Sequence, residues 1–474
     1  MRPVNALGGS ESKPSLYVAS MAGRIVIENA TIATVDAAGA ELPSGHVVIE
    51  GNRITAVGAG PAPAAPDGVA QRRFDATGSL VTPGLVNTHH HFYQWLTRGL
   101  AQNAILFDWL TTLYPVWARI DEGSVYAAAR GSITSLLLSG CTTASDHHYL
   151  FPRGAGDLLG AEIRAARELG LRLHACRGSM DLGRSAGGLP PDFAVEDIDT
   201  VLAASARAVE THHDPSPDSM LRISVAPCSP FSVTTDLLRE SAALGRRLGV
   251  RLHTHGSETV EEEAYCLERF GLRPTDYLES VGWLGSDVWM AHCVHLDDDD
   301  IARFAATGTA VAHCPSSNAR LGAGIARLPE MLAAGVPVGL GVDGAASNES
   351  GGLASELRSA MLFARARSGP SALTARQTLW LGTMGGAGLL GRADELGSLE
   401  TGKLADLAVW SVDGVEHSTI EDKVAALVMG AQPPLALLVV NGRVVVEDCR
   451  LLTADTATIA REAAHASRRL FESR

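Results

Sequence analysis

Residues 80–91 read LVTPGLVNTHHH, an apolar run that ends in three histidines. An apolar run of this length is typical of a buried β-strand. Successive side chains of a strand point to opposite faces, so we expect His89 and His91 on one side and His90 on the other. Two imidazoles on one face can bind one cation, although three adjacent histidines can also form a solvated turn.

The chain beyond this run repeats one unit, in which a helical pattern ends at a glycine and a short β-rich run follows. Glycine just past a helix end adopts the left-handed conformation that stops the helix. Such runs span residues 141–146, 171–176, 250–255, 309–314 and 336–342. Together with residues 80–88, 222–228 and 288–294 they predict the eight strands of a (β/α)8 TIM-like barrel. A doubly wound open sheet is the main alternative.

Both ends of the chain are rich in predicted strands, with turns expected at Gly51-Asn52 and Asn441-Gly442. Neither end is long enough to bury a core alone, so we expect one discontinuous β-sandwich domain built from both. The predicted division is a disordered leader at 1–22, a small β domain at 23–80 and 395–456, the barrel at 81–394 and a C-terminal helix at 457–474.

Composition limits the class of protein. With 474 residues, 46% hydrophobic and 19% charged, the chain can bury a large core. A formal net charge of -14 argues against binding to the phosphate backbone of a nucleic acid. Seven scattered cysteines without a CxxC pair favour neither disulfides nor a thiolate metal site, and no apolar stretch approaches the roughly 20 residues that span a membrane. We expect a soluble cytoplasmic protein.

Polar side chains gather where the predicted strands end, which is where barrels of this kind place their active sites. His89 and His91 end the first predicted strand, His255 ends the fifth, His292 lies in the sixth and Asp343 ends the eighth. Three imidazole nitrogens and one carboxylate oxygen suit Zn²⁺ or Fe²⁺, with one coordination position left for water. The pattern therefore predicts a metal centre.

In this arrangement the chain resembles the amidohydrolase superfamily. The resemblance rests on the His89-x-His91 pair, on His255 followed by Glu258, on His292 and Asp343, and on the segment GSLETGKLADL at residues 397–407. It extends over almost the whole chain from Gly23. The resemblance implies that His89, His91, His255 and Asp343 bind the metal.

Lysine usage bears on the number of metal ions. Many members of the superfamily bridge two ions with a carboxylated lysine on the fourth strand. Lys13, Lys403 and Lys423 are the only lysines in this chain, and all lie outside the predicted barrel. We therefore expect one divalent ion per chain, Zn²⁺ before Fe²⁺, as in the branch that deaminates purines, pyrimidines and related heterocycles.

Within that branch, the segments NTHHHFYQ at 87–94, HCPSSN at 313–318 and DGAASN at 343–348 resemble those of deaminases that act on 8-oxoguanine. The resemblance implies a hydrolytic deaminase of a guanine-like heterocycle, acting as a homo-oligomer. Alternative substrates are guanine, isoxanthopterin or another pterin, and the amino or alkylamino groups of s-triazines. A non-catalytic relative is a remote alternative, against which the complete residue set argues.

The resemblance and the chemistry together suggest a role for each catalytic residue. Asp343 is expected to take the proton of the attacking water, while His292 orients the resulting nucleophile. Glu258, on the same strand-end loop as His255, is expected to protonate the ring nitrogen. The alternative for Glu258 is a helix N-terminal glutamate on a solvated face.

Substrate recognition is expected from Gln94 and Arg177. Gln94 carries both a donor and an acceptor, as the lactam edge of a guanine-like ring requires. Arg177, at the end of the third predicted strand, offers a fork of donors to a ring carbonyl or N7, or forms an ion pair with Asp181. The aromatic residues Tyr93, Trp95 and Phe231 either stack on the ring or pack in the core. One of the two histidines that end the second predicted strand, His147 and His148, is expected to line the pocket.

Overall fold

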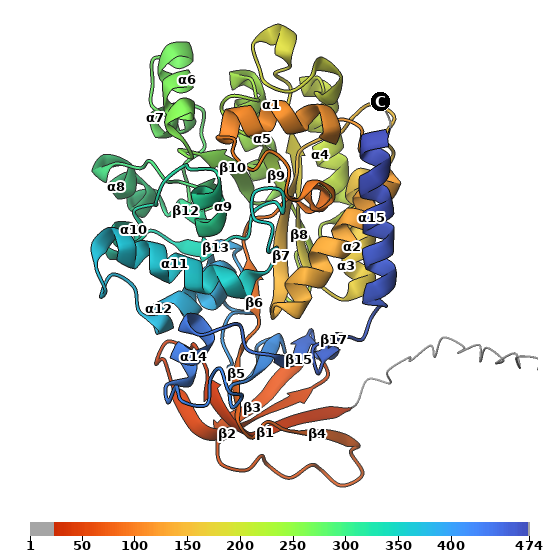
Figure 1. The fold of residues 1–474 in the computed structure, drawn as a ribbon, viewed down its shortest axis with the longest axis vertical. Coiled ribbons are helices and arrows are strands. Elements are labelled where there is room, and N and C mark those ends of the chain that lie inside the picture. The colour runs from red at the N-terminus through yellow and green to blue at the C-terminus, as the bar shows by residue number, and fades with distance from the viewer. Residues whose placement is uncertain (1–22, 473–474) are drawn as a thin grey trace, which may run out of the picture.

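The computed structural model describes residues 23–472, so the leader predicted at 1–22 lies outside the described residues. The chain forms a parallel β-barrel surrounded by helices, and a separate mixed sheet lies at one end of it (Figure 1). This mixed sheet takes strands from both ends of the chain, as predicted. The predicted fold class is therefore confirmed.

Within the described range, the barrel sheet has eight strands in the order β13-β12-β11-β10-β9-β8-β7-β6. Their bounds are β6 (Leu85–Asn87), β7 (Cys141–His148), β8 (Arg172–Ser179), β9 (Leu221–Pro227), β10 (Leu252–Gly256), β11 (Val288–His292), β12 (Ala310–His313) and β13 (Val338–Leu340). The Thr88 amide donates to the Leu340 carbonyl at 2.9 Å, and the Asp343 amide to the His89 carbonyl at 3.0 Å. These bonds bring β13 back to β6, so the C-terminal ends of all the strands meet at one mouth.

Helices cover the outside of the barrel (Figure 1). In chain order they are α1 (Leu106–Trp117), α2 (Glu122–Leu138), α3 (Leu158–Leu169), α4 (Ile198–His212), α5 (Thr235–Leu248), α6 (Val260–Phe270), α7 (Pro274–Ser280), α8 (Asp298–Thr307), α9 (Pro315–Arg320), α10 (Leu328–Ala334) and α11 (Leu353–Ser368). Short 3-10 turns are η1 (Phe92–Thr97), η2 (Arg184–Ala186) and η3 (Asp192–Ala194). The predicted glycine stops are confirmed where Gly170, Gly249 and Gly308 end their helices with φ of 83°, 68° and 73°.

The first predicted strand, residues 80–88, is two strands in two different sheets. β5 (Ser79–Pro83) pairs antiparallel with β14 (Leu407–Ser411) in the mixed sheet, whereas β6 pairs with β7 in the barrel. The chain crosses between them at Gly84, where an added Cβ would lie 2.2 Å from the Thr142 side chain. The single-strand prediction is wrong because an apolar run indicates burial but not the sheet in which it is buried.

The mixed sheet has strands from both chain ends. Besides β5 and β14 they are β1 (Arg24–Ala33), β2 (Glu41–Glu50), β3 (Arg53–Ala59), β4 (Gln71–Asp75), β15 (Leu435–Val440), β16 (Arg443–Glu447) and β17 (Arg450–Leu451). Asn441 and Gly442, between β15 and β16, have φ of 50° and 75°, as a tight I′ hairpin turn requires. The hairpin predicted there is confirmed.

The remaining elements all follow α11 in the chain. They are α12 (Ala375–Trp380), η4 (Leu381–Gly385), α13 (Gly386–Leu389), α14 (Lys423–Met429) and α15 (Thr456–Glu472), the last lying along α2 (Figure 1). A buried ion pair links the barrel to the mixed sheet, because Arg172 of β8 donates to Asp406 before β14 at 3.0 Å and 3.1 Å. Among the described helices, none combines the length and apolar character needed to cross a membrane.

Candidate metal centre and active site

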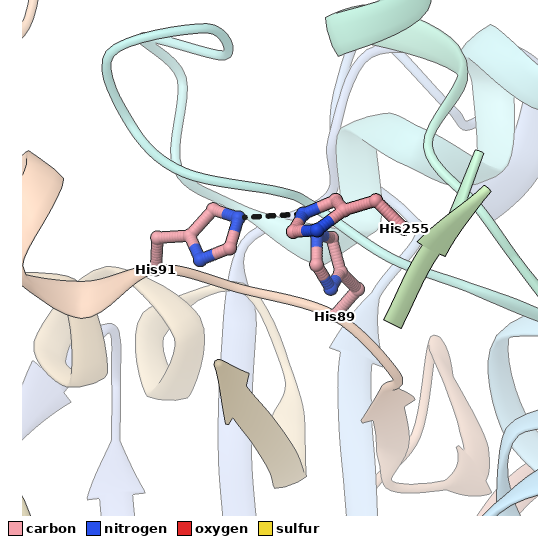
Figure 2. Close-up of side chains that lie close together, drawn as sticks. All are labelled: His89, His91 and His255. Atoms are coloured by element: carbon pink, nitrogen blue, oxygen red, sulfur yellow. Dashed lines mark hydrogen bonds between the residues drawn. The ribbon is translucent and has the colours of Figure 1, made fainter. Parts of the chain in front are cut away.

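Three histidines converge at the mouth of the barrel. Figure 2 shows His89, His91 and His255 pointing toward one another from two separate strand ends. Their ligand nitrogens all lie within 4.8 Å of one another, and Nε2 of His91 is 3.2 Å from Nε2 of His255. All three rings are buried, and Nε2 of His89 has no hydrogen-bond partner. The sequence-predicted histidines are thus brought together.

Backbone carbonyls determine which ring nitrogen of two of these histidines carries the proton. Nδ1 of His91 lies 2.7 Å from the His147 carbonyl, and Nδ1 of His255 lies 2.6 Å from the Cys228 carbonyl. A carbonyl can only accept, so each Nδ1 donates and each neutral ring presents the lone pair of Nε2 to the others. This is the tautomer that a metal-binding histidine uses.

Asp343 adds a carboxylate to the three rings. Its Oδ1 lies 3.4 Å from Nε2 of His89 and 3.3 Å from Nε2 of His91. Burial raises the pKa of Asp343, but the neighbouring His89 and His292 together lower it well below its usual range. Three imidazole lone pairs, one of them without a partner, and an ionised carboxylate are a donor set that fits a divalent ion.

Donors from the loop after β13 and from α9 hold this carboxylate in place. The Gly344 amide donates to Oδ1 of Asp343 at 2.6 Å, while the hydroxyls of Ser317 and Ser347 donate to Oδ2 at 2.6 Å and 3.0 Å. The two serines were not among the predicted functional residues. Ser347 follows Asp343 by four residues in the chain, whereas Ser317 lies on α9, which follows β12.

Glu258 and His292 lie beside the carboxylate. Nε2 of His292 is 3.7 Å from Oε1 of Glu258 and 4.0 Å from Oδ2 of Asp343, and its Nδ1 is 2.9 Å from Oδ1 of Asn318. Burial, with the negative charges of Asp343 and Glu262, raises the pKa of Glu258 to about 7. Glu258 is 3% exposed, so the alternative that placed it on a solvated helix face is wrong.

The backbone is strained at the strand ends that carry these groups. Ser257, His292 and Asp343 have φ of 51°, 71° and 66°, a region that side chains other than glycine rarely adopt. Each such residue costs about 1–3 kcal/mol and persists only where the surrounding structure enforces it. Strain of this kind concentrates at functional sites.

A cavity opens beside the cluster. Its lining includes polar groups of the cluster, namely His91, His255, Glu258, His292 and Asp343. It also includes apolar and aromatic side chains, among them Leu106, Trp109, Leu110 and Tyr114 of α1 with Tyr149 and Phe231. The contribution of α1 was not predicted, because a helix pattern in the sequence does not show what the buried face of the helix covers.

Gln94 also lines the cavity. Its side chain is 1% exposed, and its Oε1 has no hydrogen-bond partner. A Cβ at Gly344 would lie 1.8 Å from this oxygen, so glycine at that position leaves room for the amide. The amide is therefore placed to meet a bound molecule.

Arg177 lies elsewhere. Its guanidinium stacks 3.6 Å from the Phe151 ring centroid and donates to both carboxylate oxygens of Glu196 at 2.8 Å and 3.0 Å. It is not among the residues that line the cavity. The ion pair considered with Asp181 is not formed, because that carboxylate accepts from Thr234 instead.

Of the other residues considered for the pocket, Phe231 lines it, while Tyr93 and Trp95 do not. Neither histidine at the end of β7 lines the cavity, so the expectation that one does is wrong. His147 donates to the Ala226 carbonyl at 2.8 Å, and His148 lies 2.7 Å from Glu162. The His147 ring stacks on the His255 ring with centroids 5.0 Å apart, whereas the His148 ring packs against that of Phe151.

Comparison with known proteins agrees with this geometry. The model of the amidohydrolase family matches residues 80–445. An 8-oxoguanine deaminase of Pseudomonas aeruginosa is 46% identical over 92% of this chain and 97% of that protein. A hydroxydechloroatrazine ethylaminohydrolase of Pseudomonas sp. (strain ADP) is 39% identical over 93% of this chain and 94% of its own length.

A solved structure is similar over the same range. The atrazine chlorohydrolase of Arthrobacter aurescens TC1, complexed with zinc, superposes with a TM-score of 0.88 at 35% identity, covering 94% of this chain and all of that one (100%). The family model spans well over half of the chain, and the relatives align along nearly its full length. The chain therefore belongs to the amidohydrolase family.

Proposed function

We propose that this hydrolase is a metal-dependent deaminase that releases ammonia from a guanine-like heterocycle, with 8-oxoguanine as its first substrate. The observation that carries the proposal is the convergence of three imidazoles and an ionised carboxylate beside a cavity that His91, His255 and Asp343 line. The 46% identity to an 8-oxoguanine deaminase supports the choice of ring. The cytoplasmic location and the homo-oligomeric state stay predictions.

His89, His91, His255 and Asp343 are the proposed ligands of one divalent ion per chain, Zn²⁺ before Fe²⁺. The similar chlorohydrolase complexed with zinc supports the choice of metal. Among the described residues, Lys403 and Lys423 donate to carbonyls outside the barrel strands, which supports a single ion without a lysine bridge. Elemental analysis of fully active protein is expected to give one ion per chain, and a value of two would contradict this.

Asp343, His292 and Glu258 each have a proposed role in the reaction. A divalent ion at these ligands would lower the pKa of a water towards about 7. Asp343 accepts a proton from the attacking water, and His292 orients that water toward the ring. The water oxygen bonds to the ring carbon that bears the amine, and Glu258 protonates the adjacent ring nitrogen. The C–N bond then breaks as Asp343 passes its proton to the amine, which leaves as ammonia, and the hydroxyl returns its proton to Glu258 as it becomes the ring carbonyl.

Gln94 is the proposed recognition residue for the ring. Its free Oε1 and its amide N–H match the donor and the acceptor of a lactam edge. Arg177 was the other candidate, but its donors are used by Glu196 and Gly178. We therefore assign recognition to Gln94 and a packing role to Arg177.

The test is an ammonia-release screen with zinc-loaded protein. Guanine, 8-oxoguanine, isoxanthopterin, cytosine and aminotriazines are compared by kcat/KM, and alkylamine release is measured for the alkylated triazines. The highest value is expected for 8-oxoguanine. Release from triazines alone, or from no ring although zinc is bound, would overturn the proposal.

A further inference from the structure

A second layer of imidazoles lies under the proposed metal centre. His253 precedes His255 by two residues on β10, so both side chains point to the inside of the barrel. The His253 ring is fully buried and lies next to the His89 ring, with centroids 5.0 Å apart. Nothing in the proposed reaction uses His253, although it is in direct contact with a proposed ligand.

Hydrogen bonds determine which ring nitrogen donates and which accepts in both His253 and His89. Nδ1 of His253 lies 2.9 Å from the carbonyl of Trp289, which can only accept, so this nitrogen donates. A neutral ring then has its lone pair on Nε2, which lies 2.8 Å from Nδ1 of His89. His89 therefore donates from Nδ1, and its own lone pair is left on Nε2, the nitrogen that has no partner.

The other two histidines of the centre are held differently. Nδ1 of His91 and Nδ1 of His255 donate to backbone carbonyls, which no substitution of a side chain removes. Of these three rings, His89 is the one whose proton position depends on another side chain. Position 253 is thus the point at which a substitution can change the tautomer of a proposed ligand.

His253 is itself held rigidly. Its ring stacks on Trp289 at 4.5 Å with an interplanar angle of 15°. The Trp289 indole donates to the carbonyl of Thr88 at 3.1 Å, immediately before His89. The stacked pair therefore links β10 and β11 to the chain segment that carries the ligand.

We infer that His253 is a positioning residue that holds His89 in the tautomer required for metal binding, and so sets the metal affinity of the site. The inference rests on the metal centre of the proposed function. Residues that orient ligands in this way typically change metal affinity by about 10–100-fold when replaced.

The experiment measures Zn²⁺ affinity of the metal-free protein by competition with a chromophoric chelator. His253→Phe keeps a ring that can stack on Trp289 but removes the acceptor, and is expected to weaken binding by about 10–100-fold. His253→Gln restores an acceptor for His89 and a donor for the Trp289 carbonyl, and is expected to stay within a few-fold of the parent protein.

A matched control is available on β8. His174 is also buried in the barrel, but neither of its ring nitrogens has a hydrogen-bond partner. His174→Phe makes the same change of ring at a site that orients no ligand, so zinc affinity is expected to be unchanged. Thermal unfolding of each metal-free variant checks that the fold is retained.

If His253→Phe does not fold, His253→Gln is compared with His253→Asn, which is too short to reach both partners and should bind at least about tenfold more weakly. Parent-like affinity in the Phe or Asn variant, or a Gln variant as weak as either, overturns the inference. Because zinc affinity is measured without substrate, tight binding with no ammonia release from any ring would defeat the proposed function and leave this inference standing.

Discussion

Asp343 illustrates how much of the site depends on single residues. It is buried, ionised and held by three donors, and its Oδ1 is within 3.4 Å of two histidines. The carboxylate therefore has two proposed tasks, as a ligand and as the base that takes the water proton. Neither task tolerates the loss of its charge.

We predict that Asp343→Asn retains the fold but loses at least about 10²-fold in kcat, because the amide has the same shape and cannot accept the proton. Ammonia release is measured together with the zinc content and the midpoint of thermal unfolding. Turnover close to that of the parent protein at equal zinc content would contradict the role of Asp343 as base.

Gln94→Leu tests recognition of the ring. The variant leaves a lactam edge unpaired in a dry cavity, at a cost of about 1–3 kcal/mol. We expect kcat/KM to fall for guanine-type rings and much less for triazines, since the metal ligands and Glu258 are untouched. Equal losses on both ring types would mean that Gln94 supports the architecture of the site instead.

The pH dependence of the reaction follows from Glu258. Burial raises the pKa of this carboxyl to about 7, and an acid catalyst works only while protonated. Asp343, with its pKa held well below the usual range, stays ionised throughout. The rate is therefore expected to be level below about pH 7 and to fall above it, when kcat is measured from pH 5.5 to 9 at constant zinc occupancy. A rate that rises through this range would rule out Glu258 as the acid.

At the scale of elements, the packing of α3 on β7 contains a second buried acidic group. Glu162 of α3 lies 2.7 Å from Nδ1 of His148, whose Nε2 lies 2.7 Å from the Leu150 carbonyl. Because Nε2 of His148 donates to that carbonyl, Nδ1 of the neutral ring has no proton and accepts. Glu162 must therefore carry the proton that it donates to this Nδ1. Burial raises the pKa of Glu162 to about 8, in agreement with this reading.

This proton makes stability depend on pH. In the unfolded chain Glu162 loses its proton near its ordinary pKa of 4.5, whereas the folded protein keeps it to about 8. The protonated Glu162 therefore contributes its full amount to the free energy of unfolding below pH 4.5, and this contribution is lost as the pH rises to about 8. The loss is up to about 1.4 kcal/mol per pH unit. Glu162→Gln still donates to His148 but does not titrate.

We predict that the free energy of unfolding of the parent protein falls relative to that of Glu162→Gln between pH 5 and pH 8. Urea unfolding of both proteins at several pH values in this range measures the difference. Two parallel curves would show that Glu162 is ionised in the folded protein.

At the scale of the whole molecule, Arg172 and Asp406 join the barrel to the mixed sheet. Their side chains are 0% and 3% exposed, and Asp406 also accepts from the Asn441 amide at the hairpin turn. Removing one partner of a buried pair leaves an uncompensated charge, at a cost of about 3–5 kcal/mol. We therefore expect Asp406→Ala to lower the free energy of urea unfolding by that amount.

Two further variants serve as controls for Asp406→Ala. Replacing both partners, Arg172→Met with Asp406→Leu, should recover much of the loss because no buried charge remains. Asp236→Ala removes one partner of the exposed pair with Arg239, whose side chains are 79% and 56% exposed, and should have no measurable effect. If Asp406→Ala unfolds at the same urea concentration as Asp236→Ala, the ion pair does not hold the two parts together.

The sequence by itself determined most of the architecture. Glycine stops followed by β-rich runs located five of the barrel strands, and β-rich runs alone located two more, because helix termination and strand burial are local properties. The period of two in strands and the placement of polar residues at strand ends selected the residues that the structure brings together, His89, His91, His255 and Asp343.

Only the tertiary structure decided how these residues are held. Ser317 donates to a carboxylate 26 residues away, and His253 contacts a ring 164 residues away. The same holds for the split of residues 80–88 between two sheets and for the pairing of Arg177 with Glu196. A local pattern reports which side of a strand or helix is buried, whereas the partner that meets it is set by the packing of distant segments.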